Sequence, residues 1–404
     1  MINKRGDTME YIKLESIYYQ SREKYEEIYH KRFTSESSYR LDFNIKENKS
    51  FIFMDKKIVD KISNIYKYNI KLIKIKNEIP KIAVEQYTNK CLIDEIKLTN
   101  QIEGVYSTRK EIQNILKNDK EDKKRFSSLI NKYKKLEENH IKIDTCNDIR
   151  KLYDEILLME ISKEDSKDKP DGNIFRKGPV FVTGRNGQII HEGVTPEEKI
   201  IETMTKLLDF IKNHNSNPLI KIAVFHYMFG YVHPFYDGNG RLSRFISSYL
   251  LSQELEKIVA YQLSKAIFSN INGYYKMFKV TNDPVNKGDL TYFTIRFLEI
   301  IERSLIDLNE ALIERKSKLD LFSKKIDLLS DEDSIKKQVM DMLLKNTLFG
   351  EEGLSVYELE DLTDYGLTKI REVIRTLDEE KLLRTGKEGR KMIYDFDLDQ
   401  LKLI

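Results

Sequence analysis

The sequence predicts a mainly α-helical protein that also contains one β-hairpin and a C-terminal winged helix-turn-helix. Apolar residues recur at helical spacing over most of residues 56–310. Two short apolar runs flank a turn inside residues 179–190, and residues 333–404 place helical runs before a charged turn and an alternating strand. With 404 residues, the chain is long enough for two or three folding units.

The first half of the chain is expected to contain two amphipathic helices. Apolar side chains lie on one helical face from Ile58 to Ile73, and the pattern resumes after Pro80 as far as Leu98. Residues 1–55 mix Tyr, Ser and charged residues with one short alternating piece. The sequence predicts no fold for them.

A β-hairpin interrupts the helical region. Residues 179–183 and 188–190 read as two short strands, with a Gly/Asn turn at 184–187. Helical periodicity returns from Pro196 to about residue 308, and a charged helical connector is expected over residues 311–332.

Composition excludes several classes of protein. Lys and Arg number 69 against 66 Asp and Glu, and the net charge of +3 gives no global field of the kind that a dedicated nucleic-acid binder uses. The two cysteines, Cys91 and Cys146, form neither a disulfide framework nor a metal cluster. No apolar run approaches the roughly 20 residues that span a bilayer, so we expect no signal peptide, no membrane anchor and a reducing, cytoplasmic setting.

The segment that carries the chemistry lies within the second helical region. Gly238, Asn239 and Gly240 stand immediately before an apolar periodic run, so their backbone N–H groups should point outward at a helix N-terminus, an arrangement that binds anions. Arg241 and Arg244 are three residues apart on one face of the following helix. Two guanidinium groups there can reach further phosphates, so a triphosphate is the expected ligand.

Two further side chains complete this segment. Asp237, at the edge of the loop, supplies the hard oxygen ligand that Mg²⁺ prefers. The unperturbed pKa of a histidine is about 6.5, so His233 can take a proton from an attacking hydroxyl at neutral pH. A histidine beside a proline, or an Asp-Gly-Asn-Gly turn, is most often structural when it stands alone. Together with two arginines in one stretch they favour a nucleotide site.

The string His-Pro-Phe-Tyr-Asp-Gly-Asn-Gly-Arg-Leu-Ser-Arg at 233–244 resembles the signature of the Fic family, HPFx(D/E)GNGRxxR, at every defined position. A weaker resemblance covers roughly residues 55–305. It implies a compact helical bundle and a protein adenylyltransferase, which moves AMP from ATP onto a Ser, Thr or Tyr hydroxyl of a protein, itself included, and releases pyrophosphate.

The same resemblance implies a role for each residue of the string. His233 would deprotonate the target hydroxyl, and Asp237 would hold Mg²⁺ on the α and β phosphates. The anion hole would consist of Gly238, Asn239 and Gly240. Arg241 would hold the β phosphate and Arg244 the γ phosphate.

Three more features acquire a meaning from this resemblance. The hairpin at 179–190 would be the flap along which the target segment lies as an added strand, although a surface hairpin without function also fits. Tyr274 and Tyr275 would line the adenine pocket, and core packing explains them nearly as well. Relatives that phosphorylate their targets have Lys at the position of Gly240, so this chain favours AMP transfer.

An inhibitory helix is expected near residues 90–104. Thr99, Glu103 and Gly104 fit the pattern (S/T)xxxEG, which is weak by itself because many helices end in glycine. Beside the full signature it resembles the family's N-terminal inhibitory helix. A carboxylate on Glu103 would then pair with Arg244 and occupy the cation that otherwise grips the γ phosphate.

The C-terminal unit, residues 333–404, resembles a winged helix-turn-helix. Lys369, Arg371 and Arg375 could face DNA, but Glu372 and neighbouring acidic residues dilute this face. A docking or dimerisation module is therefore favoured over DNA binding.

Two rival functions stay open in the sequence. One is a transcriptional regulator whose Fic centre only senses nucleotide. The other is a hydrolase that uses the same site to remove AMP, because a carboxylate placed like that of Glu103 can orient water. The target protein, the modified residue, the oligomeric state and the role of residues 1–55 are not predicted.

Overall fold

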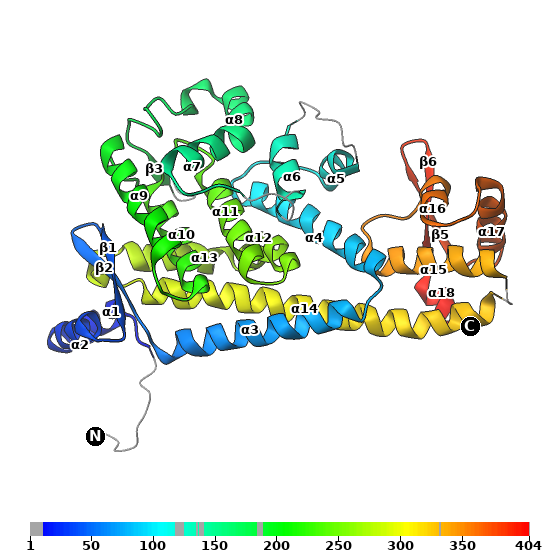
Figure 1. The fold of residues 1–404 in the computed structure, drawn as a ribbon, viewed down its shortest axis with the longest axis horizontal. Helices are drawn as coiled ribbons and strands as arrows, with labels where there is room; N and C mark the ends of the chain where they lie inside the picture. The colour runs from blue at the N-terminus through cyan, green and yellow to red at the C-terminus, as the bar shows by residue number, and fades with distance from the viewer. Residues whose placement is uncertain are drawn as a thin grey trace, which may run out of the picture. The chain divides into compact units, whose positions relative to one another are not determined.

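A computed structural model describes residues 11–117, 125–134, 136, 141–183, 189–330 and 333–403. Within these ranges the protein is mainly helical, with two-stranded antiparallel sheets, as the sequence predicts (Figure 1). The chain divides into two compact units. The first comprises Met1–Asn69 with Ile93–Leu305, and the second comprises Ile70–Leu92 with Ile306–Ile404.

The elements up to the second unit follow one another in this order: α1 Leu14–Gln20, α2 Arg22–Thr34, β1 Ser38–Ile45, β2 Asn48–Phe53, α3 Lys56–Asn77, α4 Lys81–Ile102, α5 Arg109–Lys117, α6 Ser127–Lys134, α7 Cys146–Tyr153, η1 Asp154–Leu158, α8 Met159–Glu164, η2 Ser166–Asp168, β3 Phe181–Thr183, β4 Ile189–Glu192, α9 Glu197–Asn213, α10 Pro218–Val232, α11 Asn239–Glu254, η3 Lys257–Gln262, α12 Leu263–Ser269, α13 Ile271–Asn282, η4 Pro284–Asn286 and α14 Thr291–Leu329. The helices expected on either side of Pro80 are α3 and α4. The boundary between the two units falls inside α3, α4 and α14.

Helix α10 is the centre of the first unit. It is apolar on every side, which is typical of a helix surrounded by others, and nearly all of its residues are buried. Its N-terminus is set by Asn217, whose side chain accepts from the Leu219 N–H, with Pro218 in the first turn. Figure 1 shows α10 beside α9 and α11, drawn in green. The packing around α10 therefore fixes the position of its C-terminal end, at Val232.

The N-terminal segment, whose fold the sequence does not predict, forms α1, α2 and the β1–β2 hairpin. It packs on the connection between α13 and α14. The Tyr25 hydroxyl donates to the Val285 carbonyl at 2.7 Å, and the buried Arg32 guanidinium pairs with Asp289 at 3.4 Å. These contacts anchor the segment to the first unit.

The hairpin β3–β4 is antiparallel, with Phe181 opposite Glu192 and Val182 opposite His191. The turn expected at 184–187 lies outside the described residues. Phe181, Ile189 and Ile190 expose between 46% and 57% of their surface. The hairpin thus presents apolar side chains to solvent, which leaves room for a bound segment.

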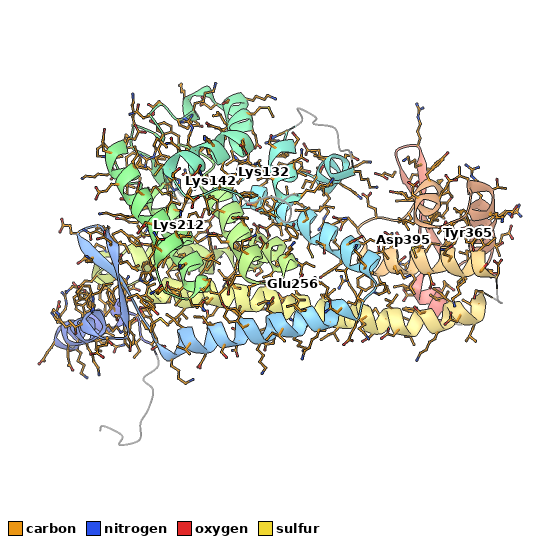
Figure 2. All side chains as sticks on the ribbon, viewed as in Figure 1. Lys132, Lys142, Lys212, Glu256, Tyr365 and Asp395 are labelled. Atoms are coloured by element: carbon orange, nitrogen blue, oxygen red, sulfur yellow. The ribbon has the colours of Figure 1, made fainter. Side chains whose placement is uncertain are left out.

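The second unit ends in six elements: α15 Ser334–Phe349, α16 Val356–Leu362, α17 Leu367–Glu379, β5 Leu383–Glu388, β6 Lys391–Phe396 and α18 Leu398–Leu403. Leu354, just before α16, bridges to Tyr394 of β6. The carboxylate of Asp395, labelled in Figure 2, accepts from the Thr347 hydroxyl at 3.2 Å. The unit thus consists of three helices, an antiparallel hairpin and a short last helix.

Each helix of the described ranges is too short or too polar to cross a membrane.

Candidate nucleotide-binding site

The loop between α10 and α11 is fixed by its own residues. The ring of Phe235 is fully buried and stacks on Tyr153 with ring centroids 3.8 Å apart. The side-chain amide of Asn239 donates to the Phe235 carbonyl at 2.8 Å and accepts from the Phe235 N–H at 3.0 Å. Asn239 therefore braces the loop with its side chain, and its backbone N–H is left at the helix end.

The N-terminus of α11 begins at Gly238, whose φ of +81° lies in the left-handed region. A Cβ there would also lie 2.9 Å from side-chain atoms of Leu157 and Ile161, so only glycine fits. The first intrahelical bond runs from the Leu242 N–H to the Gly238 carbonyl. The N–H groups of Asn239, Gly240 and Arg241 consequently form the free, positive end of the helix dipole.

His233 caps the C-terminus of α10 in a left-handed conformation, with φ of +53°. Its Nδ1 lies 3.2 Å from the Gly230 carbonyl. A carbonyl only accepts, so Nδ1 carries the proton and Nε2 of the neutral ring carries the lone pair that can accept one. Burial lowers the pKa of His233 to about 4. The side chain is therefore a neutral proton acceptor at physiological pH.

This lowered pKa can be tested directly. Because the pKa is lowered, the neutral ring should persist in the folded protein as pH falls through 6.5, and protonation should follow only near pH 4. We expect the NMR signal of the His233 ring, assigned by comparison with His233→Ala, to stay unshifted from neutral pH down to about pH 5. A midpoint near 6.5 would contradict the burial of the ring, because it is the value of a solvated histidine.

Arg241 is fully buried and is held from two sides. Its Nη1 donates to Glu160 of α8 at 2.6 Å, and its Nη2 lies 3.7 Å from Asp237. Among the residues that the structure describes, its Nε and Nη2 have no hydrogen-bond partner. A buried donor without an acceptor is costly, so an anionic ligand at this point would be stabilised.

The donor set at Asp237 fits a magnesium ion bound together with phosphate. Across the described ranges, no group of three or more His, Cys, Asp or Glu side chains could hold a metal ion. A Mg²⁺ ion in a nucleotide site, however, needs only one or two carboxylates, with phosphate oxygens and waters as its other ligands. The Asp237 side chain is 46% exposed, so one of its oxygens is available.

Arg244 is buried and donates to three acceptors on or just after α4. Its Nε donates to the Thr99 hydroxyl at 2.8 Å, its Nη2 to the Thr99 carbonyl at 2.9 Å, and its Nη1 pairs with Glu103 at 2.8 Å. Gly104 follows with φ of +74°. All three nitrogens of the guanidinium thus contact residues that the sequence singles out upstream.

The carboxylate of Glu103 also covers the start of α11. A Cβ at Gly240 would overlap this carboxylate. Glu103 therefore lies directly over the helix end that would bind an anion, and a larger residue at position 240 is incompatible with this arrangement.

The two expected adenine-pocket residues differ in their surroundings. Tyr274 is buried, and its hydroxyl lies 2.8 Å from Nε2 of His226. Tyr275 exposes 46% of its surface and packs edge-on against Tyr274. Tyr275 is therefore the ring on which an adenine could stack, and Tyr274 packs against Tyr275.

Sequence reasoning missed several residues of this site. His226 is buried, and burial lowers its pKa to about 3, so it stays neutral between Ser247 and Tyr274. Glu160 and Arg176 are also buried here. The charge of Glu160 inside the apolar run Leu157-Leu158-Met159-Glu160-Ile161 was a usable signal, because a buried carboxylate needs a cation.

The part of the chain that carries this site matches a known family model. The Fic/DOC family model matches residues 143–251, which include the loop and most of α11, so this stretch carries a Fic/DOC domain. A protein adenylyltransferase Fic of Drosophila yakuba is 27% identical over 168 residues. That alignment covers 41% of this chain and only 30% of the relative, so the chain spans less than a third of its length.

The fold is shared with a solved structure. A Fic family protein from Desulfovibrio desulfuricans superposes with a TM-score of 0.53 at 18% identity, over 89% of this chain and 98% of that one. A Fic domain-containing signalling protein from Bacteroides thetaiotaomicron gives a TM-score of 0.45 at 18% identity, over 62% of this chain and 96% of that one.

Proposed function

We propose that the protein is an adenylyltransferase that moves AMP from ATP onto a Ser, Thr or Tyr hydroxyl of a protein, including itself, and that an N-terminal inhibitory helix restrains it. The observation that carries this proposal is the juxtaposition of a neutral His233 with the free N-terminus of α11 and two buried arginines. The family match over this stretch and the name of the Drosophila relative support it.

The reaction starts at His233. Nε2 takes the proton of the target hydroxyl, and the hydroxyl oxygen attacks the α phosphorus of ATP. A bond from this oxygen to phosphorus forms as the bond to the β-phosphate oxygen breaks, and pyrophosphate leaves. The proton goes to Nε2 because Nδ1 already donates to the Gly230 carbonyl.

The phosphates are held by the residues around His233. The N–H groups of Asn239 and Gly240, at the positive end of α11, would stabilise charge on the α and β phosphates. Arg241 would bind the β phosphate with its Nε and Nη2, which have no hydrogen-bond acceptor among the described residues. Asp237 would hold Mg²⁺, which when bound supplies charge neutralisation on the phosphate oxygens.

The restraint lies in Arg244. Its guanidinium would bind the γ phosphate, yet Thr99 and Glu103 occupy its donors. ATP that enters would then be misplaced at its γ end, and a misplacement of about 1 Å is enough to slow transfer about a hundredfold.

Intact-mass spectrometry tests the proposed function. The Glu103→Gly chain incubated with Mg²⁺ and ATP should gain the mass of one adenylyl group on a Ser, Thr or Tyr, which peptide mapping would locate. A gain equal to one phosphoryl group would contradict AMP transfer and indicate a kinase orientation of the nucleotide.

The C-terminal unit is proposed to dock a partner and not DNA. Lys369, Arg371 and Arg375 are exposed on α17, but so is Glu379, which pairs with Arg375 at 3.8 Å. We expect fluorescence anisotropy with the full chain to show no tight binding to duplex DNA. Tight binding that weakens steeply with added salt would favour the regulator instead.

A further inference from the structure

The segment that leads into β3, residues 171–178, is bonded along its length to the loop that follows α10. We name this segment the strap. Arg176 N–H donates to the Pro234 carbonyl at 3.3 Å, and Gly178 N–H donates to the Tyr236 hydroxyl at 2.9 Å. That hydroxyl in turn donates to Asp171 at 3.0 Å. Tyr236 thereby connects both ends of the strap to the loop that carries His233.

Arg176 stands at the centre of these contacts. Its guanidinium is fully buried, and it donates to four backbone carbonyls. The acceptors are His233 at 2.8 Å, Gly178 at 2.5 Å, Val194 at 2.9 Å and Val232 at 3.3 Å. One planar cation thus binds the end of α10, the start of the β3–β4 hairpin and the chain that leaves the hairpin.

The conformation of His233 explains why such a clamp is needed. A non-glycine residue in the left-handed region is disfavoured, so the surroundings must hold His233 there. Arg176 does so through the His233 carbonyl. The same guanidinium bonds to both ends of the hairpin, so the histidine and the hairpin edge share one support.

We propose that Arg176 and Tyr236 are positioning residues that fix the distance between His233 and the edge of the β3–β4 hairpin. A hydroxyl on a segment bound at that edge then arrives within reach of Nε2. The inference rests on the proposed function, since it concerns the same base and the same bound target. Neither residue touches the reacting atoms; each acts through the backbone of the loop.

If the strap sets this distance, loosening it should impair AMP transfer to protein more than AMP transfer to water. A water molecule is not carried by the hairpin edge, so its attack on ATP does not depend on the distance that the strap sets. Loosening the strap should therefore lower the yield of modified protein relative to free AMP. A residue that only stabilised the fold would lower both products together.

The experiment uses the full chain with Glu103→Gly as the parent, and adds either Tyr236→Phe or Arg176→Lys. Tyr236→Phe keeps the ring and removes both strap bonds, and Arg176→Lys keeps the charge with too few donors for four carbonyls. Labelled AMP is measured on protein and free in solution, and nucleotide affinity is measured by calorimetry. We expect about a tenfold fall in the ratio of protein-bound to free AMP, with nucleotide affinity unchanged.

Matched controls come from the N-terminal segment. Tyr25→Phe removes one tertiary hydrogen bond, to the Val285 carbonyl. Arg32→Lys replaces a buried arginine that donates to the Ile12 carbonyl at 2.8 Å. Both should leave the ratio unchanged. Equal loss of both products in the strap variants, or the same shift in the controls, would overturn the proposal. A parent that passes AMP to neither protein nor water would instead contradict the proposed function.

Discussion

His233→Ala should lose transfer by at least about a hundredfold, within the range of about 10² to 10⁴ that a general base contributes. The variant should still bind ATP and Mg²⁺, because the phosphate ligands at the start of α11 and on Arg241 are unchanged. The rate is measured from α-labelled ATP in the Glu103→Gly background and the affinity by calorimetry.

The matched control for this change is His30→Ala, since His30 is an exposed histidine on α2. It should transfer AMP at the parent rate. A His233→Ala variant that keeps the parent rate would remove His233 from the mechanism. One that loses ATP binding as well would show that the histidine shapes the phosphate site and is not only a base.

Glu103→Gly should raise self-modification by about ten- to a hundredfold. Removing the carboxylate takes away the partner 2.8 Å from Arg244 and clears the space over Gly240. The guanidinium can then seat the γ phosphate, and the α phosphorus regains its place before the attacking hydroxyl. The measurement is the initial rate of label incorporation from α-labelled ATP. The matched control is Gln101→Gly, which places a glycine at an exposed position two residues earlier, near the end of α4. It should not raise the rate of self-modification.

This gain should depend on Arg244. In the double variant Glu103→Gly with Arg244→Ala, the stimulation should largely vanish, because no cation remains to seat the phosphate. Such non-additivity is expected of two residues in direct contact. A flat rate in Glu103→Gly would contradict the inhibitory role. If that variant instead loses the ability to remove AMP from a modified protein, Glu103 serves the hydrolytic reaction.

The sequence predicts the parts of the site that are contiguous in the chain. His233, Asp237 and the residues from Gly238 to Arg244 lie on one loop and the first turns of one helix, so their spacing alone indicates an anion site. The helical fold follows in the same way from periodicity.

The partners of residues that act through long-range contacts could not be found from local sequence patterns. Arg176 reaches His233 from 57 positions away, and Glu160 reaches Arg241 from 81. Neither has a local pattern that names its partner. The N-terminal segment is similar, because its core contact at Val285 is 260 positions from Tyr25. Only the fold brings such residues together.

The most direct test of AMP transfer uses two labels. The Glu103→Gly chain is incubated with Mg²⁺ and ATP labelled at either the α or the γ phosphate, and the protein is separated from nucleotide. The α label should appear on the protein, and the γ label should leave entirely with pyrophosphate. Label from the γ position on the protein, or no label from either position, would contradict the proposed adenylyltransferase.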